Sequence, residues 1–370
     1  MSEKFNSICI FVPLLAGGGA EHVAVRIANE LAAKGGSVDL VLAQVKGAYL
    51  SEVSNKVNIV DLKCSDGFST IKSLPGLIKY LRKNKPSILF STLFRANTIS
   101  ALAIRLARVN TKLILRHPNM LYPEGDENLS YYSKLNKKAA IWAAKKADVL
   151  VLTSKAMERE LLDLTNFDRK KIKIIHNPVP IDEIQLKAKE KSGHEWLDDK
   201  NVPVILAVGR LSYQKNFESL IRAFAELRER RESRLIILGE GEERAKLENL
   251  VEELKIQEYV SMPGFVSNPY SYMSRCDVFV LPSRWEGFPN VLVEAMACNA
   301  SVIATNCPGG SAEILENGKY GQLVEVGDVL GLVAAIERVF DNDFSVSSSL
   351  KVSDFHISRI ISNYLDHFKS

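Results

Sequence analysis

Two cations and two carboxylates are the side chains of this 370-residue chain whose types and spacing best suit chemistry. Arg210 and Lys215 lie five residues apart, just after the apolar run Val204–Val208. An arginine fork with a lysine point charge suits a diphosphate, although a solvated basic loop is the plainer alternative. Glu286 and Glu294 lie eight residues apart on either side of an expected helix start. They can hold a polyhydroxyl–phosphate ligand at two points, or serve only as a turn residue and a helix-face charge.

Glycine-rich turns precede two expected helices. Gly17–Gly19 lies between an expected strand, Ile8–Leu14, and an expected helix, Glu21–Lys34. Glycines there let a ligand approach the backbone, and the helix start offers N–H groups and the positive end of its dipole. A dinucleotide fingerprint needs G-x-G-x-x-G, and His22 replaces its third glycine. Contact with a phosphate or substrate is therefore favoured over NAD binding or a plain turn. Cys307–Gly310 is a similar but weaker signal.

The histidines, cysteines and paired aspartates do not predict a metal site. The six histidines show no HxxH or HxxxH spacing, and the five cysteines include no CxxC pair, which is typical of a reduced, cytosolic protein. The D-x-D triplet Asp341–Asp343 follows an expected helix and is interpreted as its end. His117 ends an expected strand and can reach a ligand there, although a lone histidine is more often structural.

The charge is divided unevenly along the chain. Residues 1–180 carry 27 Lys and Arg against 15 Asp and Glu, a formal charge of +12, whereas residues 181–370 carry 21 against 29, or −8. A basic half indicates an anionic partner: a membrane surface, a diphosphate or a nucleic acid. Ser69–Lys85 has one apolar face and several basic residues, so it can lie on an anionic bilayer or simply pack one face in the core. Nucleic acid is disfavoured because no aromatic platform accompanies the basic residues.

The order of the expected elements predicts the fold. Short Val/Ile/Leu runs alternate with helical patterns, and the alternation restarts after residue 200, which predicts an α/β protein with two doubly wound domains. We place the N-terminal domain at residues 1–180, a linker at 181–201 and the second domain at 202–353. No apolar run approaches the length of a membrane span. The last segment, 354–370, has helical spacing with one apolar face that must pack on another surface.

The two cations and two carboxylates together resemble the large retaining GT-B glycosyltransferase group known as glycosyl transferases group 1. Its pattern is G-R-x4-K followed by E-G-F-x5-E, here Gly209–Lys215 and Glu286–Glu294. The resemblance spans essentially the whole chain and is nearest to bacterial enzymes of polysaccharide and glycolipid synthesis. It implies two Rossmann-like domains facing a central cleft, with residues 354–370 packed back on the first domain.

The resemblance also implies the roles of individual residues. Arg210 and Lys215 would hold the donor diphosphate, Glu294 the nucleotide ribose, and Glu286 the hydroxyl groups of the donor sugar. His117 would contact the donor sugar, and Val266 would lie near the nucleotide base. The phosphates would be contacted by Gly18 and Gly19 and by the segment of Phe288, Pro289, Asn290 and Val291. Residues on the acceptor side would lie in Phe94–Asn97 and Asn119–Asp126.

The implied activity is transfer of a sugar from a nucleotide sugar, with UDP the favoured nucleotide and an N-acetylhexosamine the favoured sugar, to a lipid-linked or polysaccharide acceptor. The anomeric configuration of the sugar would be retained, and the reaction would need no metal or other cofactor. The protein would lie in the cytoplasm or on the inner face of the plasma membrane. Two alternatives stay open: a nucleotide-sugar epimerase or hydrolase on the same fold, and a non-catalytic scaffold that binds nucleotide sugars.

Overall fold

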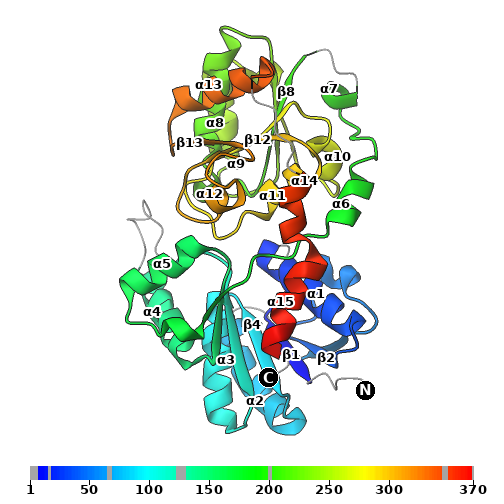
Figure 1. Ribbon diagram of the computed structural model, residues 1–370, viewed down its shortest axis with the longest axis vertical. Helices are drawn as coiled ribbons and strands as arrows, with labels where there is room; N and C mark the ends of the chain where they lie inside the picture. Colours follow the sequence, from blue (N-terminus) through cyan, green and yellow to red (C-terminus); the bar gives the residue numbers. More distant parts are fainter. Residues whose placement is uncertain are drawn as a thin grey trace. The chain divides into compact units, whose positions relative to one another are not determined.

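The computed structural model describes residues 7–15, 18–64, 69–121, 131–198, 202–343 and 349–368, in two compact units (Figure 1). The first unit continues as far as Pro178 and resumes at Ile357, whereas Val179–His356 belong to the second. Each unit is built around its own parallel sheet. The predicted α/β class with two doubly wound domains is confirmed.

The described part of the first unit forms a seven-stranded parallel sheet in the order β3-β2-β1-β4-β5-β6-β7. The order reverses between β1 and β4, which is the kind of switch point where open α/β sheets bind ligands. The elements are β1 (Ile8–Val12), α1 (Gly19–Ala33), β2 (Val38–Leu42), η1 (Ala48–Glu52), β3 (Asn58–Asp61), α2 (Ser69–Asn84), β4 (Ile88–Thr92), α3 (Phe94–Ala107), β5 (Lys112–His117), α4 (Tyr131–Lys146), β6 (Val149–Leu152), α5 (Lys155–Leu164), η2 (Arg169–Lys171), β7 (Ile172–Ile174) and α15 (Ile357–Phe368).

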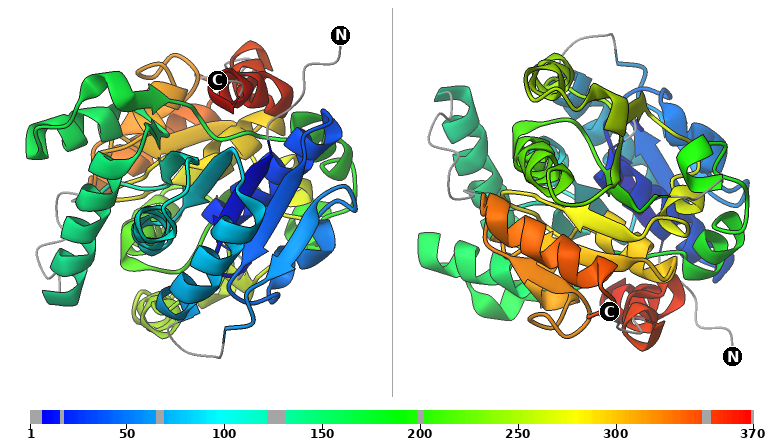
Figure 2. Two further views of the ribbon diagram at one scale, coloured as in Figure 1. Left: turned by 90° about the horizontal axis from the view of Figure 1, so that it is seen from below. Right: turned by 90° about the horizontal axis from the view of Figure 1, so that it is seen from above.

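Helices cover both faces of this sheet (Figure 2). One face packs against α1 and α15, and the other against α2, α3, α4 and α5. Every residue of β1 and β4 is buried, which explains why Ile8–Val12 and Ile88–Phe90 are apolar without alternation.

The described part of the second unit forms a six-stranded parallel sheet in the order β10-β9-β8-β11-β12-β13, with its switch point between β8 and β11. Its elements are α6 (Ile181–Lys187), α7 (Glu195–Asp198), β8 (Val204–Val208), η3 (Tyr213–Lys215), α8 (Phe217–Arg228), β9 (Arg234–Leu238), α9 (Arg244–Glu253), η4 (Gln257–Tyr259), β10 (Val260–Gly264), α10 (Tyr270–Met273), β11 (Val278–Leu281), α11 (Asn290–Ala297), β12 (Ser301–Thr305), α12 (Ser311–Ile314), β13 (Gln322–Val324), α13 (Val329–Phe340), α14 (Ser349–Val352) and η5 (Ser353–Phe355).

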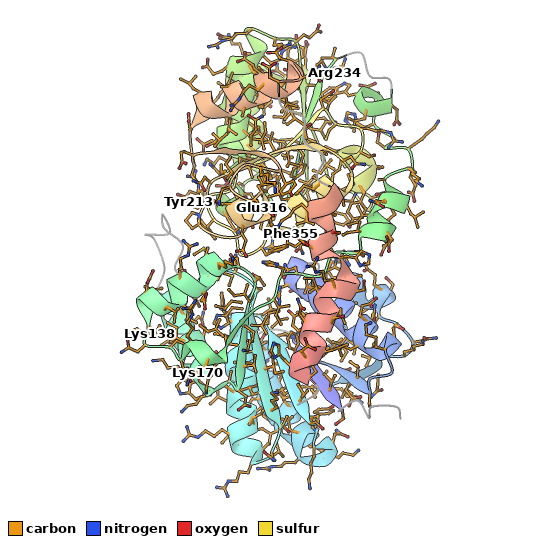
Figure 3. The ribbon with its side chains drawn as sticks, in the orientation of Figure 1. Lys138, Lys170, Tyr213, Arg234, Glu316 and Phe355 are labelled. Atoms are coloured by element: carbon orange, nitrogen blue, oxygen red, sulfur yellow. The ribbon has the colours of Figure 1, made fainter. Side chains whose placement is uncertain are left out.

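The C-terminal helix α15 lies beside α1 in the first unit (Figure 1). Its apolar face enters the core there, where Phe90 of β4 makes edge-to-face contacts with Tyr364 and Phe368, at ring-centroid distances of 5.8 and 5.9 Å. The helix starts at Ile357, three residues later than the predicted segment, because His356 is extended and forms a β-bridge with Val179. Phe355, before the bridge, packs in the second unit's core (Figure 3).

The predicted linker 181–201 is wrong as a description of residues 181–198. These residues belong to the second unit and form α6 and α7. Ile181, Ile184 and Leu197 are buried in its core. The charged residues that suggested a linker are the solvated side of short helices, and the chain leaves the first unit at Pro178.

Candidate functional site

The most distinctive feature of the second unit is an ion pair at its switch point. Lys215 ends η3 in the loop after β8, and Glu286 lies in the loop after the neighbouring strand β11. Lys215 Nζ is 2.6 Å from Glu286 Oε1, and the two side chains are only 16% and 7% exposed. The structure therefore brings together two predicted site residues that are 71 positions apart in the sequence.

Glu286 is held in place by Ser283 and Thr305, which our sequence reasoning missed, and by Pro308 of the predicted turn Cys307–Gly310. Ser283 donates a hydrogen bond from Oγ to the same Oε1 atom at 2.7 Å, and Thr305 of β12 donates to the Ser283 carbonyl. The Glu286 amide donates to the carbonyl of Pro308 at 2.9 Å. Glu286 Oε2 has no hydrogen-bond partner among the described residues, so this oxygen can accept a bond from a ligand.

Two glycines allow the loops around this pair to pack backbone against backbone. Gly309 has φ +134°, and a Cβ there would lie 2.0 Å from the Glu286 carbonyl oxygen. Gly239, also at φ +134°, would place a Cβ 1.9 Å from the Gly209 carbonyl oxygen. Any other residue would push the loop carrying Glu286 or the loop carrying Arg210 out of position.

Burial and charge around Glu286 also act on Cys307. Burial, together with the negative charge of Glu286, raises the pKa of the Cys307 thiol to about 11. The thiol is therefore protonated at neutral pH and is a poor nucleophile.

Arg210 follows β8 directly and is exposed. Its guanidinium has no hydrogen bond or ion pair with any described residue. An exposed guanidinium without a protein partner is ready to bind a phosphate or carboxylate through two parallel hydrogen bonds.

Helix α11 begins after the Glu286 loop with Pro289 at its N-cap position. The first amides of a helix have no acceptor within it, and the positive end of its dipole lies there, which are the features by which helix starts bind phosphates in proteins. Asn290 and Val291 open this helix, and Glu294 follows one turn later. Phe288 is buried against Phe355 and anchors the loop rather than facing solvent.

Val266 follows β10 and is partly buried against the second unit's core. Its neighbour Phe265 is 79% exposed, which our sequence reasoning did not single out. An exposed aromatic ring beside the position expected near a nucleotide base is suited to stacking.

The remaining predicted residues belong to the first unit. His117 ends β5, is 1% exposed, and has no hydrogen-bond partner for Nε2 in the described chain. Burial, with the neighbouring charge of Arg116, lowers the pKa of His117 to about 3. The imidazole is therefore neutral at physiological pH, where it can form a hydrogen bond but does not serve as an acid. Gly18 caps α1 in an extended conformation, and Gly19 is its first residue.

Several predicted residues fall outside the described part of the chain, namely Gly17 and the end of the proposed acceptor segment, residues 122–126. Within the part that is described, no group of three or more His, Cys, Asp or Glu side chains is arranged to hold a metal ion. In that same part, every helix is too short or too polar to span a bilayer.

Comparison with known proteins gives the class. A family model described as Glycosyl transferases group 1 matches residues 188–352, and one described as Glycosyltransferase Family 4 matches residues 17–183. The N-acetylgalactosamine-N,N'-diacetylbacillosaminyl-diphospho-undecaprenol 4-alpha-N-acetylgalactosaminyltransferase of Campylobacter jejuni is 32% identical over 345 residues, covering 90% of both chains. The capsular polysaccharide biosynthesis glycosyltransferase CapM of Staphylococcus aureus is 28% identical, covering 83% of this chain and 82% of that one.

The fold agrees with solved structures. HepE from Anabaena, crystallised with UDP-glucose, superimposes with a TM-score of 0.83 at 20% identity, covering 98% of this chain and 100% of that one. The two Rossmann-like units therefore form a GT-B fold, and the chain belongs to the glycosyl transferases group 1 family. It is a glycosyltransferase, and the two relatives given above are named for lipid-linked glycan and capsular polysaccharide synthesis.

Proposed function

We propose that the protein transfers an N-acetylhexosamine from its UDP-sugar to a lipid-linked or polysaccharide acceptor, with retention of configuration at the anomeric carbon. The observation that carries the proposal is the Lys215–Glu286 ion pair at the switch point, together with the guanidinium of Arg210, which has no partner among the residues that the structure describes. One group is an anion with an unused oxygen, and the other two are cations. A sugar diphosphate, with hydroxyl groups at one end and negative charge at the other, matches this arrangement.

Positive charge at this place would promote departure of the diphosphate. As the anomeric bond breaks, negative charge grows on the leaving phosphate oxygens, and cations already in position stabilise it. Arg210 would bind through its fork and Lys215 through ammonium protons not used by Glu286. The start of α11 would add its dipole and amides. These groups supply the charge that a divalent ion supplies elsewhere, so we propose that transfer needs no metal.

Glu286 would position the donor sugar rather than remove a proton. One of its oxygens is held by Lys215 and Ser283, which leaves Oε2 to accept a bond from a sugar hydroxyl. In the proposed retaining reaction, the acceptor hydroxyl attacks on the face that the diphosphate leaves, and a phosphate oxygen takes its proton. His117, neutral at physiological pH, would contact the donor sugar by a hydrogen bond and would not transfer a proton.

The relatives support the donor and acceptor classes. The Campylobacter jejuni relative is named for moving N-acetylgalactosamine to a saccharide on diphospho-undecaprenol. HepE, which shares the fold, binds UDP-glucose. We propose the same two classes here: a UDP-linked amino sugar as donor and a polyprenyl-diphosphate glycan as acceptor.

A nucleotide screen followed by a transfer assay tests this function. Thermal stability is measured with UDP, GDP, ADP and their sugars, with and without EDTA, and transfer is then followed with a polyprenyl-diphosphate saccharide. We expect UDP compounds alone to raise the melting temperature, equally in EDTA, and transfer to require acceptor. Free sugar or an epimer formed without acceptor would show a hydrolase or epimerase, and binding without turnover would show a scaffold.

A further inference from the structure

The helix layer α2, α3 and α4 has an unusual charge composition. These three helices contain no Asp or Glu at all. In the sequence, no acidic residue occurs between Asp66 and Glu124, a stretch that includes α2 and α3 but not α4. At the chain's average of 44 acidic residues in 370, those 57 residues would hold about seven. The opposite face is mixed, with Glu21 and Glu30 on α1 and Asp366 on α15.

The same layer presents many exposed cations. α3 contacts α2 on one side and α4 on the other, so the three helices form one surface. Figure 3 shows Lys138 on the outer side of α4. The exposed basic residues on or directly after these helices are Lys72, Lys79, Arg82, Lys83, Lys85, Arg95, Arg105, Arg108, Lys138, Lys145 and Lys146.

The orientation of α2 is fixed by its inner side. Tyr80 donates a hydrogen bond to Asp39 of β2 at 2.5 Å, and Leu77 and Leu81 are fully buried in the sheet-facing core. Helical spacing then leaves Lys79 and Lys83 on the outside. Neither lysine side chain has a hydrogen bond or ion pair with a described residue, so their charges are not neutralised within that part of the protein.

Apolar side chains are interspersed among these charges. Ile71 of α2 is 60% exposed, Leu106 of α3 48% and Leu135 of α4 53%. A depression of about 550 Å³ on α2 is lined by apolar and basic residues together: Pro75, Ile78, Lys79, Arg82 and Lys83. Exposed aliphatic side chains within a basic surface are typical of segments that lie in the headgroup region of an anionic bilayer.

We propose that the layer α2–α3–α4 docks on an anionic phospholipid bilayer. Charge complementarity argues for this occupant, since the charged residues of the three helices are all basic and would meet the negative potential of a membrane leaflet. Among the side chains that the structure describes in this layer, the three large exposed apolar ones are aliphatic, whereas single-stranded nucleic acid is held by aromatic side chains that stack on bases. The inference goes beyond the proposed sugar transfer and can be tested without donor or acceptor.

The test is flotation of the full chain with vesicles of phosphatidylcholine, with and without phosphatidylglycerol, at about 0.15 M salt. The variant Lys79→Glu/Lys83→Glu reverses two charges of the layer. Lys34→Glu/Lys56→Glu is its matched control, because it makes the same change of net charge at two exposed lysines outside the layer. Equal melting temperatures establish that both variants are folded.

We expect wild-type protein to bind only the anionic vesicles. The layer variant should bind them at least about 30-fold more weakly, since each lost lysine contributes about 1 kcal/mol and each new glutamate is repelled, whereas the control should lose much less. Ile71→Ser should weaken binding about tenfold at any salt concentration, because it removes an apolar contact. Equal loss in both charge variants, equal binding to neutral vesicles, or preference for single-stranded RNA over vesicles would each overturn the proposal.

Discussion

Replacing Glu286 with glutamine distinguishes the contribution of the ion pair at the switch point to stability from its contribution to sugar transfer. The isosteric Glu286→Gln change preserves the shape of the side chain, and the amide oxygen of glutamine can still accept a hydrogen bond from Ser283. It removes the negative charge 2.6 Å from Lys215 Nζ, in a place where both side chains are mostly buried. Removing one partner of a buried pair costs up to about 5 kcal/mol, and retained hydrogen bonding with some solvent access reduces this to about 2 kcal/mol here.

That loss corresponds to a melting temperature lower by about 4–8 °C for a domain of this size. The affinity for UDP should rise or stay unchanged, because the positive charge of Lys215 is no longer neutralised by Glu286. Transfer should fall at least ~100-fold, since the variant lacks the charged acceptor for the donor sugar. Lys215→Met should instead weaken UDP binding by about 10- to 100-fold.

Melting curves, titration calorimetry with UDP and initial transfer rates measure these three effects. Glu218→Gln is the matched control, because Glu218 accepts from Lys246 at 2.7 Å in an exposed pair. Exposed pairs contribute at most about 1 kcal/mol. A Glu286→Gln protein that melts and transfers like wild type, or that loses UDP affinity as Lys215→Met does, would refute the reasoning.

Three further predictions follow from the site. Arg210→Ala should weaken UDP binding about 10- to 100-fold in calorimetry and leave the melting temperature unchanged, because the guanidinium has no partner in the described chain. A lower melting temperature for this variant would contradict the prediction. Gly309→Ala should lower the free energy of unfolding, measured by chemical denaturation, by more than about 2 kcal/mol and should abolish UDP binding. Gly327 also has a positive φ but has open space around it, so Gly327→Ala should lower the free energy of unfolding by only about 1 kcal/mol. His117 has a pKa of about 3 in the folded protein against 6.5 ordinarily, so the unfolded chain binds an extra proton between these pH values. The free energy of unfolding should therefore fall as the pH decreases from 6.5, by up to about 1.4 kcal/mol per pH unit. Chemical denaturation at pH 7 and pH 5 should show a smaller decrease for His117→Gln than for wild type.

The fold was predictable in outline because its strands are buried on both faces. Such strands are short apolar runs, and β1 and β8 lie close to the runs Ile8–Leu14 and Val204–Val208 that predicted them. The edge strands β7 and β13 are harder to predict, since three residues give no readable pattern. The segment after Pro178 was interpreted as a linker because α6 and α7 are short and bury only a few side chains among many charges.

The site was predictable as a set of residues but not as an arrangement. Spacing and resemblance indicated Lys215 and Glu286, but a salt bridge across 71 positions depends on the pairing of β8 with β11. Ser283 and Thr305 support Glu286 through single hydrogen bonds and leave no pattern in the sequence. The burial that keeps His117 neutral likewise comes from packing around β5, including Phe94, whose ring lies 5.0 Å away.

The anomeric configuration of the product tests the central proposal most directly. The purified protein is incubated in EDTA with a UDP-N-acetylhexosamine and a polyprenyl-diphosphate saccharide, and the new glycosidic bond is examined by NMR. We predict a product with the same anomeric configuration as the donor, formed at the same rate with and without EDTA. A product of inverted configuration, or the absence of transfer to any such acceptor by protein that binds UDP, would contradict the proposal.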